Sequence, residues 1–422
     1  MHRISKEEFE LFLIKYERPI SIAALLIVFV WTIIVTYIQN GWGDIDNYYR
    51  NISSVIDQHQ MPYSEAVFEY PPLMLVFFLV PKICSYDLAS FHTSYLVFST
   101  IFLFINCRLM MKISDRLSSS KHRVLFIIVS LIVFSNNFIF CRADIFVSGM
   151  VLWGILLYMD GKSELSSALL AAATMTKLYP VLIFGIIIAM IFMRHDWRRL
   201  FRCVAIFAAV CVLAELPFLI VDASTAFAYL NYHSDRGLQI QAVITSAFLL
   251  YNLFVPGSVT VVNNFYSDNI VNPVADAIAS YMNIITIIVI LIFGLWMLTR
   301  MRNIRDSDEK MKMCFTLMPI IVMVFITFSK VYSAQYLIWA VTLLPLVYLP
   351  LLTDRGTALL TASYLGWGTM QFIEETYTYG MLCDLNPFAV VITILKNASL
   401  VMYMIQLILI FHRHTGDISQ DR

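Results

Sequence analysis

The chain has 422 residues, of which 59% are hydrophobic and only 14% are charged, and its mean hydropathy is +0.75. Soluble domains carry about 25% charged residues, so this composition excludes an ordinary water-soluble protein. Lysine plus arginine and aspartate plus glutamate each number 29, so the net charge is zero and the sequence lacks the electrostatic footprint of a nucleic-acid partner.

Apolar segments suited to crossing a bilayer recur from end to end of the chain. The first follows a charged N-terminal segment and is not followed by a small-residue cleavage site, so we expect a retained helix rather than a signal peptide. We predict a single all-α, polytopic membrane domain over residues 1–422, with about 12 helices, from the usual length of such segments. The predicted spans are 21–39, 92–111, 124–141, 145–159, 165–176, 179–193, 203–221, 276–299, 313–329, 335–352, 356–372 and 388–411.

The apolar segment 70–81 is too short for a full crossing, and counting it as one would export the basic loop at 112–123. We therefore expect it to be a re-entrant segment or a half-span. The spans 165–176 and 179–193 are also short, which membrane proteins tolerate where the broken helices line an enclosed cavity.

Lysine and arginine gather in the connections 112–123, 193–202 and 300–312 and in both terminal segments, 1–20 and 412–422. The positive-inside tendency places all of these in the cytoplasm. The external side then receives the first external loop with its short segment, 40–91, a large loop region, 222–275, and the turns 142–144, 177–180, 330–335 and 373–387. Nearly every unusual polar cluster lies in these external segments, which indicates a site there. No retention signal is evident, and a plasma-membrane location fits.

The first external loop places two carboxylates, Asp44 and Asp46, just beyond the first span. If the segment is extended, alternation puts both on one side. Two solvated aspartates are the simplest interpretation, but the loop also carries Tyr48-Tyr49, Pro62-Tyr63 and Tyr70-Pro71-Pro72. A carboxylate held at a low-dielectric boundary can act as a general base or bind a divalent metal. The sequon at Asn51 is a weak glycosylation pattern.

Lys177 interrupts an apolar stretch, followed closely by Tyr179 and Pro180. A buried cation is costly unless it is paired or hydrated, so either it reaches the interface by snorkelling or it contacts a lipid phosphate. Arg142 and Asp144 lie at a turn between two spans, where they either pair to hold two helices together or contact substrate.

The densest polar cluster contains Tyr232, His233, Asp235, Arg236 and Gln239. Arg236 suits bidentate phosphate binding, and His233 suits proton transfer near neutral pH. A solvated loop is the alternative.

Four further polar residues lie at external turns. Lys330 and Gln335 occupy one turn, where Lys330 fits an interfacial anchor equally well. Glu374 and Glu375 face the same side, with only their location to recommend them. The seven cysteines occur singly, without metal or redox spacing, and are interpreted as small apolar residues.

The first loop resembles that of the integral-membrane C-type glycosyltransferases: Asp-x-Asp-x-Tyr from Asp44, then Pro62-Tyr63, then Tyr70-Pro-Pro-Leu before an apolar segment. The resemblance is closest to the polyprenyl-phosphate-mannose-dependent mannosyltransferases of glycosyltransferase family 87, and the chain is also similar to the catalytic subunit of the first GPI mannosyltransferase. Three later segments fit in the same order: TMTKLYPVLIFGI (174–186), YHSDRGLQIQAVITS (232–246) and FSKVYSAQYLIWAVTLLPL (328–346). A WWDYG-like motif typical of oligosaccharyltransferases is not found in the sequence.

The resemblance implies an aspartate of the first loop as catalytic base, with Asp44 the better match and Asp46 close behind; it leaves open whether a divalent metal takes part. It also implies transfer of a hexose, mannose above all, from a polyprenyl-phosphate donor to a lipid or glycan acceptor on the external face. A secondary transporter or lipid flippase is the alternative. That class predicts polar groups near the bilayer midplane and an internal repeat, and we find no such repeat in the sequence.

Overall fold

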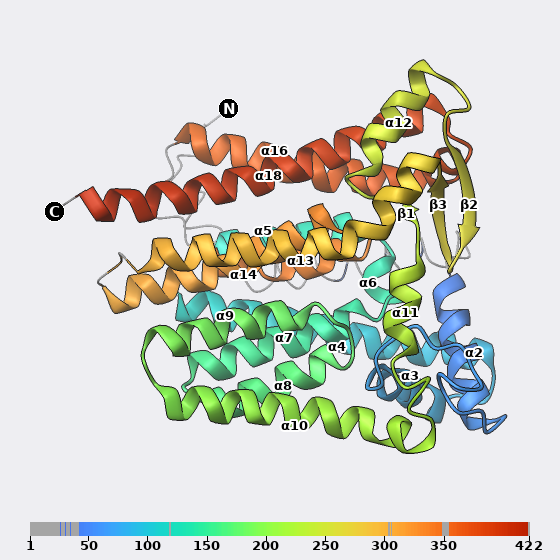
Figure 1. Cartoon of the computed structure of the whole chain (residues 1–422), viewed down its shortest axis with the longest axis horizontal. Helices are drawn as coiled ribbons and strands as arrows, with labels where there is room; N and C mark the ends of the chain where they lie inside the picture. Colours follow the sequence, from blue (N-terminus) through green and yellow to red (C-terminus); the bar gives the residue numbers. More distant parts are fainter. Residues whose placement is uncertain are drawn as a thin grey trace, which may run out of the picture.

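The computed structural model describes residues 26, 30, 34, 42–117, 120–302, 304, 306–347 and 354–420, and their side chains except those of 233, 354, 355, 414 and 416–420. Over these residues the protein is a bundle of helices that run roughly parallel or antiparallel to its long axis (Figure 1). Five helices are long and apolar enough to cross a membrane: Leu88–Arg116, Trp197–Val221, Pro273–Met301, Ser307–Phe328 and Pro387–Arg413.

In the first half of the bundle, shorter helices lie between the long α4 and α10: α4 (Leu88–Arg116), α5 (Lys121–Ser135), α6 (Phe138–Cys141), α7 (Asp144–Met159), α8 (Ser163–Thr174), α9 (Pro180–Met193) and α10 (Trp197–Val221). The breaks have local causes. Asn136 ends α5 with a φ of 50°, and Pro180 stands at the first position of α9, where its missing N–H costs nothing.

The second half contains α13 (Pro273–Met301), α14 (Ser307–Phe328), α15 (Tyr336–Thr342), η1 (Leu344–Leu346), α16 (Asp354–Ile373), the π-helical turn η2 (Glu374–Thr378), α17 (Tyr379–Cys383) and α18 (Pro387–Gln420). Burial separates central from peripheral helices. The most apolar part of α14 is 78% buried, whereas that of α10 is 6% buried, so α14 forms the core and α10 faces lipid.

One end of the bundle carries the remaining elements: α2 (Gly43–Ile56), α3 (Met74–Ile83), α11 (Ala228–Asp235), β1 (Leu238–Gln239), α12 (Thr245–Phe254), β2 (Thr260–Asn264) and β3 (Ser267–Val271) (Figure 1). The strands form a small antiparallel sheet in the order β1-β3-β2. This sheet was not predicted, because its β2–β3 turn places Phe265 and Tyr266, rather than the usual Asn-Gly, at positive φ.

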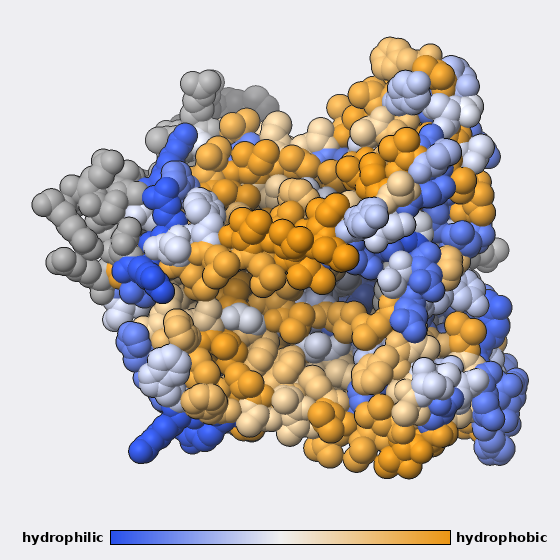
Figure 2. Space-filling model, in the orientation of Figure 1, coloured by the Kyte–Doolittle hydropathy of each residue, from blue (hydrophilic) through white to orange (hydrophobic). Residues whose placement is uncertain are grey.

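The two ends of the bundle differ in kind. The basic turns α4–α5, α9–α10 and α13–α14 lie at the end where α18 finishes, and α2, α11 and the strands lie at the opposite end, which we call the outer end (Figure 1). Between hydrophilic residues at both ends, the face in Figure 2 is an apolar belt. This pattern is that of a protein that spans a bilayer.

Each predicted span after the first contains a helix, although the span 124–141 is divided at Asn136 between α5 and α6, and the all-α, polytopic prediction is confirmed for the bundle. The first span, 21–39, lies outside the described residues except for Leu26, Val30 and Ile34, which are helical. Within the predicted span 335–352, α15 ends at Thr342 and η1 follows over Leu344–Leu346, while 348–352 lie outside the described residues. Residues 74–81 of the short segment lie in the ten-residue α3 (Met74–Ile83) at the outer end, which is too short for a full crossing, as predicted.

Candidate active site

The first external loop folds as the amphipathic helix α2, which buries Ile45, Tyr48 and Ile52. Asp44 and Asp46 lie in its first turn, where the helix dipole favours negative charge. The expectation that both carboxylates share one side of an extended segment is wrong, because residues two apart on a helix point in different directions. The two aspartates consequently have different partners.

Asp44 points into the protein and pairs with Arg142, with 2.5 Å between Oδ2 and Nε. Arg142 lies in the turn between α6 and α7. Burial raises the pKa of the Asp44 carboxyl, and the charge of Arg142 opposes that rise. Asp44 is therefore a carboxylate with more affinity for a proton than an ordinary aspartate, held in place by a cation.

Asp46 faces a more open environment and contacts His92, at 2.6 Å from its Nε2. The His92 ring stacks on Trp42 at 4.4 Å between centroids. His92 was not predicted as a site residue, because nothing in its local sequence distinguishes it.

A second ion pair joins Asp144, at the start of α7, to Lys177, in the break before α9, at 2.6 Å. Asp144 is buried, and its Oδ1 also accepts a hydrogen bond from Trp339 Nε1 at 2.5 Å. Arg142 and Asp144 thus pair with separate partners rather than with each other. Lys177 does not snorkel to water: it is largely enclosed, with Nζ 5.0 Å from the centre of the Trp339 ring.

Aromatic rings enclose this second pair. Tyr179 stacks on Trp339 at 4.4 Å and Tyr336 stacks on it at 3.9 Å, and Lys177 Nζ lies 5.8 Å from the centre of the Tyr70 ring. Trp339 lies within the motif segment 328–346, but its role was not anticipated from the sequence. The rings exclude water and so strengthen the electrostatic interactions around Asp144.

A third cationic group comes from the large external region. The guanidinium of Arg236 lies 5.7 Å from the Tyr232 ring centre, and its Nε has no hydrogen-bond partner among the described residues. Lys330 is buried, and its Nζ donates to the carbonyl of Ser234 at 2.7 Å. Burial lowers the pKa of Lys330.

Gln239 and Gln335 lie near the cationic group formed by Arg236 and Lys330. Gln239 donates its backbone N–H to the Lys330 carbonyl at 3.0 Å, while its side-chain Oε1 is buried without a partner among the described residues. Gln335 accepts a hydrogen bond from Ser333. The side chain of His233 lies outside those that the structure describes.

The clusters belong to one site. Contacts join them: Trp339 of α15 bonds Asp144, Lys177 lies 5.8 Å from the ring of Tyr70, which packs against Tyr48 of α2, and Lys330 bonds Ser234 of α11. Residues from α2, the α6–α7 turn, the α8–α9 break, the α11–β1 segment and α15 therefore meet at the outer end. In the described part of the chain, no group of three or more histidine, cysteine, aspartate or glutamate residues is arranged to hold a metal ion.

A buried network lies beside this site and was not predicted. Lys396 and Glu374 form an ion pair with both side chains fully buried. Gln241 donates from Nε2 to Glu374 at 2.9 Å and to Glu375 at 2.5 Å, and Thr393 also donates to Glu374. The network fastens the segment after β1 to α18.

Comparison with known proteins gives one assignment. A family model described as glycosyltransferase family 87 matches residues 68–329. No curated protein matches the chain significantly. The matched range includes Arg142, Asp144, Lys177 and Arg236, whereas Asp44 precedes it and Trp339 follows it.

Proposed function

The chain belongs to glycosyltransferase family 87, and on that premise we propose that it moves a hexose, mannose above all, from a polyprenyl-phosphate donor to a lipid or glycan acceptor. Membership of the family supports a membrane glycosyltransferase and favours this class over the transporter alternative. The observation that carries the finer proposal is the meeting of two aspartate–cation pairs and Arg236 at the outer end.

The proposed step is a single displacement. The acceptor hydroxyl oxygen attacks the anomeric carbon as the bond from that carbon to the phosphate oxygen breaks, and the phosphate leaves with the bonding electrons. Asp44 takes the hydroxyl proton, and in-line attack inverts the anomeric configuration. An acid is not required, because a phosphate is a good leaving group.

Two features make Asp44 the preferred base over Asp46. Its pKa is raised by burial, which brings its proton affinity closer to what a general base needs. It also lies against Arg142 on the inward side of α2, whereas the more exposed Asp46 faces His92. Asp46 remains the alternative base.

Cations stabilise the departing phosphate in this proposal. Arg236, with its unpartnered Nε, offers the bidentate group, and Lys177 offers a point charge in a water-poor pocket. Tyr70, Tyr179, Gln239, Lys330 and Gln335 surround these cations or position the segments that carry them. A divalent metal ion bound with substrate is compatible with this arrangement.

We place the outer end on the external face of the plasma membrane and both termini in the cytoplasm, because the basic turns lie at the opposite end. Single cysteines introduced at Asp57 and at Asp196, in a background without native cysteines, test this orientation in whole cells. Labelling by an impermeant maleimide is expected at position 57 and not at position 196; the reverse pattern contradicts the placement.

The activity test offers purified protein a series of labelled polyprenyl-phosphate hexoses with membrane lipid and glycan acceptors. Transfer with inversion from the mannose donor is expected, together with its loss in Asp44→Asn and its retention in the matched variant Asp57→Asn. Transfer only from nucleotide sugars, or retention of configuration, contradicts the proposed donor or the proposed displacement respectively.

A further inference from the structure

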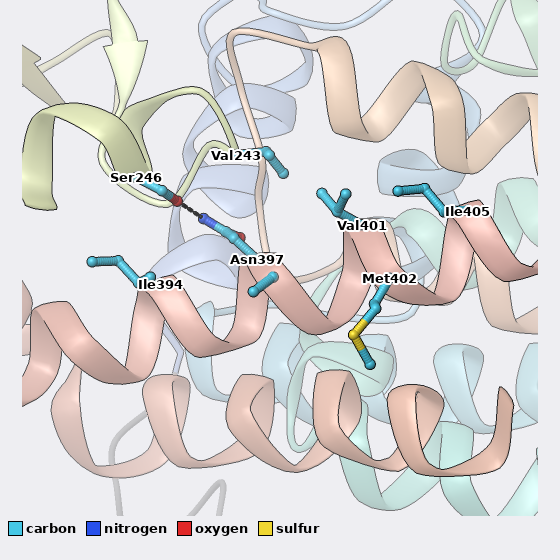
Figure 3. A pocket seen from close by; sticks show the side chains of 8 residues that line it. Val243, Ser246, Ile394, Asn397, Val401, Met402 and Ile405 are labelled. Carbon is cyan, nitrogen blue, oxygen red and sulfur yellow. Dashed lines mark hydrogen bonds between the residues drawn. The ribbon is translucent and has the colours of Figure 1, made fainter. Parts of the chain in front are cut away.

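Two cavities of the protein differ in chemistry. The larger runs along α18 and is lined mostly by apolar side chains, with Asn397 and Ser246 bonded to each other at one side (Figure 3). The smaller, of about 80 Å³, lies against α2 at the outer end, and all of its lining residues except a valine carry a polar group. We call it the α2 pocket; it is lined by Asn47, Arg50, Asn51, Val67, Glu69 and Tyr266.

The lining of the α2 pocket suits a neutral ligand that is rich in hydroxyl groups. Arg50 and Glu69 carry opposite charges, so the charge of the lining sums to zero. Arg50 also donates to Asn47 Oδ1 at 2.5 Å, which engages the cation within the pocket wall. An anion or a metal ion is a poor match, because neither meets an excess of opposite charge. The amide, carboxylate and phenol groups together offer both donors and acceptors.

An exposed aromatic ring forms one side of the α2 pocket. Tyr266 lies in the turn between β2 and β3 and is 70% exposed. A sugar ring has hydroxyl groups, which hydrogen bond to polar side chains, and a face of C–H groups, which packs on an aromatic ring. An exposed tyrosine beside a neutral polar lining therefore matches a sugar unit.

The turn that carries Tyr266 is strained. Phe265 and Tyr266 have φ values of 51° and 50°, a region that bulky side chains rarely adopt. Such strain persists only where surrounding contacts impose it, and it is concentrated at functional sites. Here Phe265 packs on Tyr232 at 5.5 Å between ring centres, and Asp268 accepts a hydrogen bond from the Tyr379 hydroxyl at 2.6 Å. These contacts hold the turn beside α2 (Figure 1).

The α2 pocket continues the face of α2 that carries the proposed base. Asp44, Asn47 and Asn51 follow one another at spacings of three and four residues, so they lie along one face of the helix. At 1.5 Å per residue, Asn47 lies ~4.5 Å and Asn51 ~10 Å beyond Asp44 along the helix axis. A ligand that reaches the base can therefore also reach the pocket.

Glu69 connects the α2 pocket to the cations of the candidate active site. It lines the pocket and directly precedes Tyr70, whose ring lies 5.8 Å from Lys177 Nζ. Burial raises the pKa of the Tyr232 hydroxyl, and the neighbouring Glu69 carboxylate raises it further. The Tyr232 ring in turn lies 5.7 Å from the Arg236 guanidinium. The pocket is thus a neighbour of the active site and not a separate surface feature.

We propose that the α2 pocket binds a sugar unit of the acceptor, so that the acceptor is a glycan or glycolipid rather than a simple lipid alcohol. The proposal rests on the proposed function and names the acceptor class. In-line displacement puts the base and the acceptor on the side of the anomeric carbon opposite the leaving phosphate, and the pocket lies beyond the base on α2. A cavity of about 80 Å³ holds only part of a larger ligand, in agreement with one sugar of a longer molecule.

The first test measures binding without transfer. Methyl hexosides of mannose, glucose and galactose, and the corresponding disaccharides, are added to the full-length protein in micelles of a sugar-free detergent. Saturation-transfer NMR is expected to detect binding of at least one of them, with weaker saturation of its ring protons in Tyr266→Gly. Absence of binding by all of them, or equal saturation in the variant, overturns the proposal.

The choice of glycine separates recognition from folding. Glycine adopts positive φ without strain, so Tyr266→Gly is expected to leave the free energy of unfolding unchanged or to raise it. A merely structural Tyr266 predicts lower stability with unchanged sugar binding, and that result overturns the proposal. Tyr86→Ala is the matched control, because Tyr86 is another exposed tyrosine, lies just before α4 and does not line the α2 pocket.

The second test compares acceptors. Tyr266→Gly is expected to raise KM for octyl dihexoside acceptors about three- to tenfold, as loss of an aromatic packing contact predicts. KM for the donor is expected to stay within about twofold, since only acceptor binding is changed. Tyr86→Ala is expected to leave both values unchanged. An equal rise in KM for the donor, or transfer to octanol as efficient as transfer to the octyl dihexosides, overturns the proposal.

The two tests separate the sugar-subsite proposal from the proposed function. Sugar binding at the α2 pocket without hexose transfer from any polyprenyl donor contradicts the proposed function and leaves the sugar subsite. Transfer from a polyprenyl donor that is unaffected by Tyr266→Gly for every acceptor contradicts the sugar subsite and leaves the transferase intact.

Discussion

A single and a double variant of the Asp144–Lys177 pair separate the contribution of Lys177 to stability from its contribution to hexose transfer. Among the described residues, Lys177→Met leaves the buried Asp144 carboxylate with the Trp339 N–H as its one remaining hydrogen-bond partner. Breaking a buried pair by removing one partner costs about 3–5 kcal/mol, and the remaining hydrogen bond favours the lower end of that range. We expect the free energy of unfolding in mixed micelles to fall by about 3 kcal/mol.

The double variant Asp144→Asn/Lys177→Met removes both charges and keeps an amide oxygen able to accept from Trp339. It is expected to recover most of the lost stability, because no uncompensated charge remains. Transfer is expected to stay roughly 10- to 100-fold below native, since a charge-assisted hydrogen bond contributes about 1.5–3 kcal/mol. Full recovery of both stability and transfer in the double variant refutes the role of Lys177 in phosphate binding.

Three further predictions follow from other ion pairs. Glu374→Gln leaves the fully buried Lys396 without its ion-pair partner and is expected to lower the free energy of unfolding by about 3–5 kcal/mol in the same assay. Adding Lys396→Met is expected to recover most of this loss. Asp44 must be ionised to act as base and burial raises its pKa, so kcat/KM is expected to fall as the pH drops through that raised pKa. Arg142→Gln removes the cation that lowers the Asp44 pKa, so it is expected to move the acid limb of the pH–rate profile to higher pH. An acid limb that does not move contradicts the assignment of Asp44 as base. Asp57→Ala breaks an exposed ion pair and is expected to cost less than about 1 kcal/mol of unfolding free energy.

Hydropathy and charge patterning predicted most of the bundle, because bilayer thickness and unsatisfied backbone groups constrain spanning segments strongly. The same reasoning predicted that 70–81 is re-entrant or a half-span rather than a full crossing, since a full crossing would place the basic turns at different ends. The extended alternative for the segment around Asp44 was wrong, because α2 already begins at Gly43 and its burial of Ile45, Tyr48 and Ile52 follows a helical spacing.

The partners within the site were harder to predict than its members. Asp44, Arg142, Asp144 and Lys177 were each selected from the sequence, but their pairing depends on how α2 packs against the α6–α7 turn and the α8–α9 break against the start of α7. Such contacts span many residues and leave no local signal. Trp339 looks like an ordinary apolar residue of a membrane helix until its indole N–H is seen to bond Asp144.

The Glu374–Lys396 pair shows a different limit of sequence analysis. Hydropathy counts each charge within or beside a span as a penalty, and Lys396 lies inside the predicted span 388–411 without an obvious partner. The partner is Glu374, which lies in the π-helical turn that follows α16. Only the packing of α16 against α18 reveals that the two charges compensate each other.

The central claim is that Asp44 acts as the base in hexose transfer from a polyprenyl-phosphate donor. The most direct measurement is single-turnover transfer from labelled polyprenyl-phosphate-mannose by native protein, Asp44→Asn and Asp46→Asn, each purified and shown to be equally folded. We predict transfer by the native protein, retention of measurable transfer by Asp46→Asn, and loss of transfer by Asp44→Asn with donor binding preserved. Native-like transfer by Asp44→Asn contradicts the account.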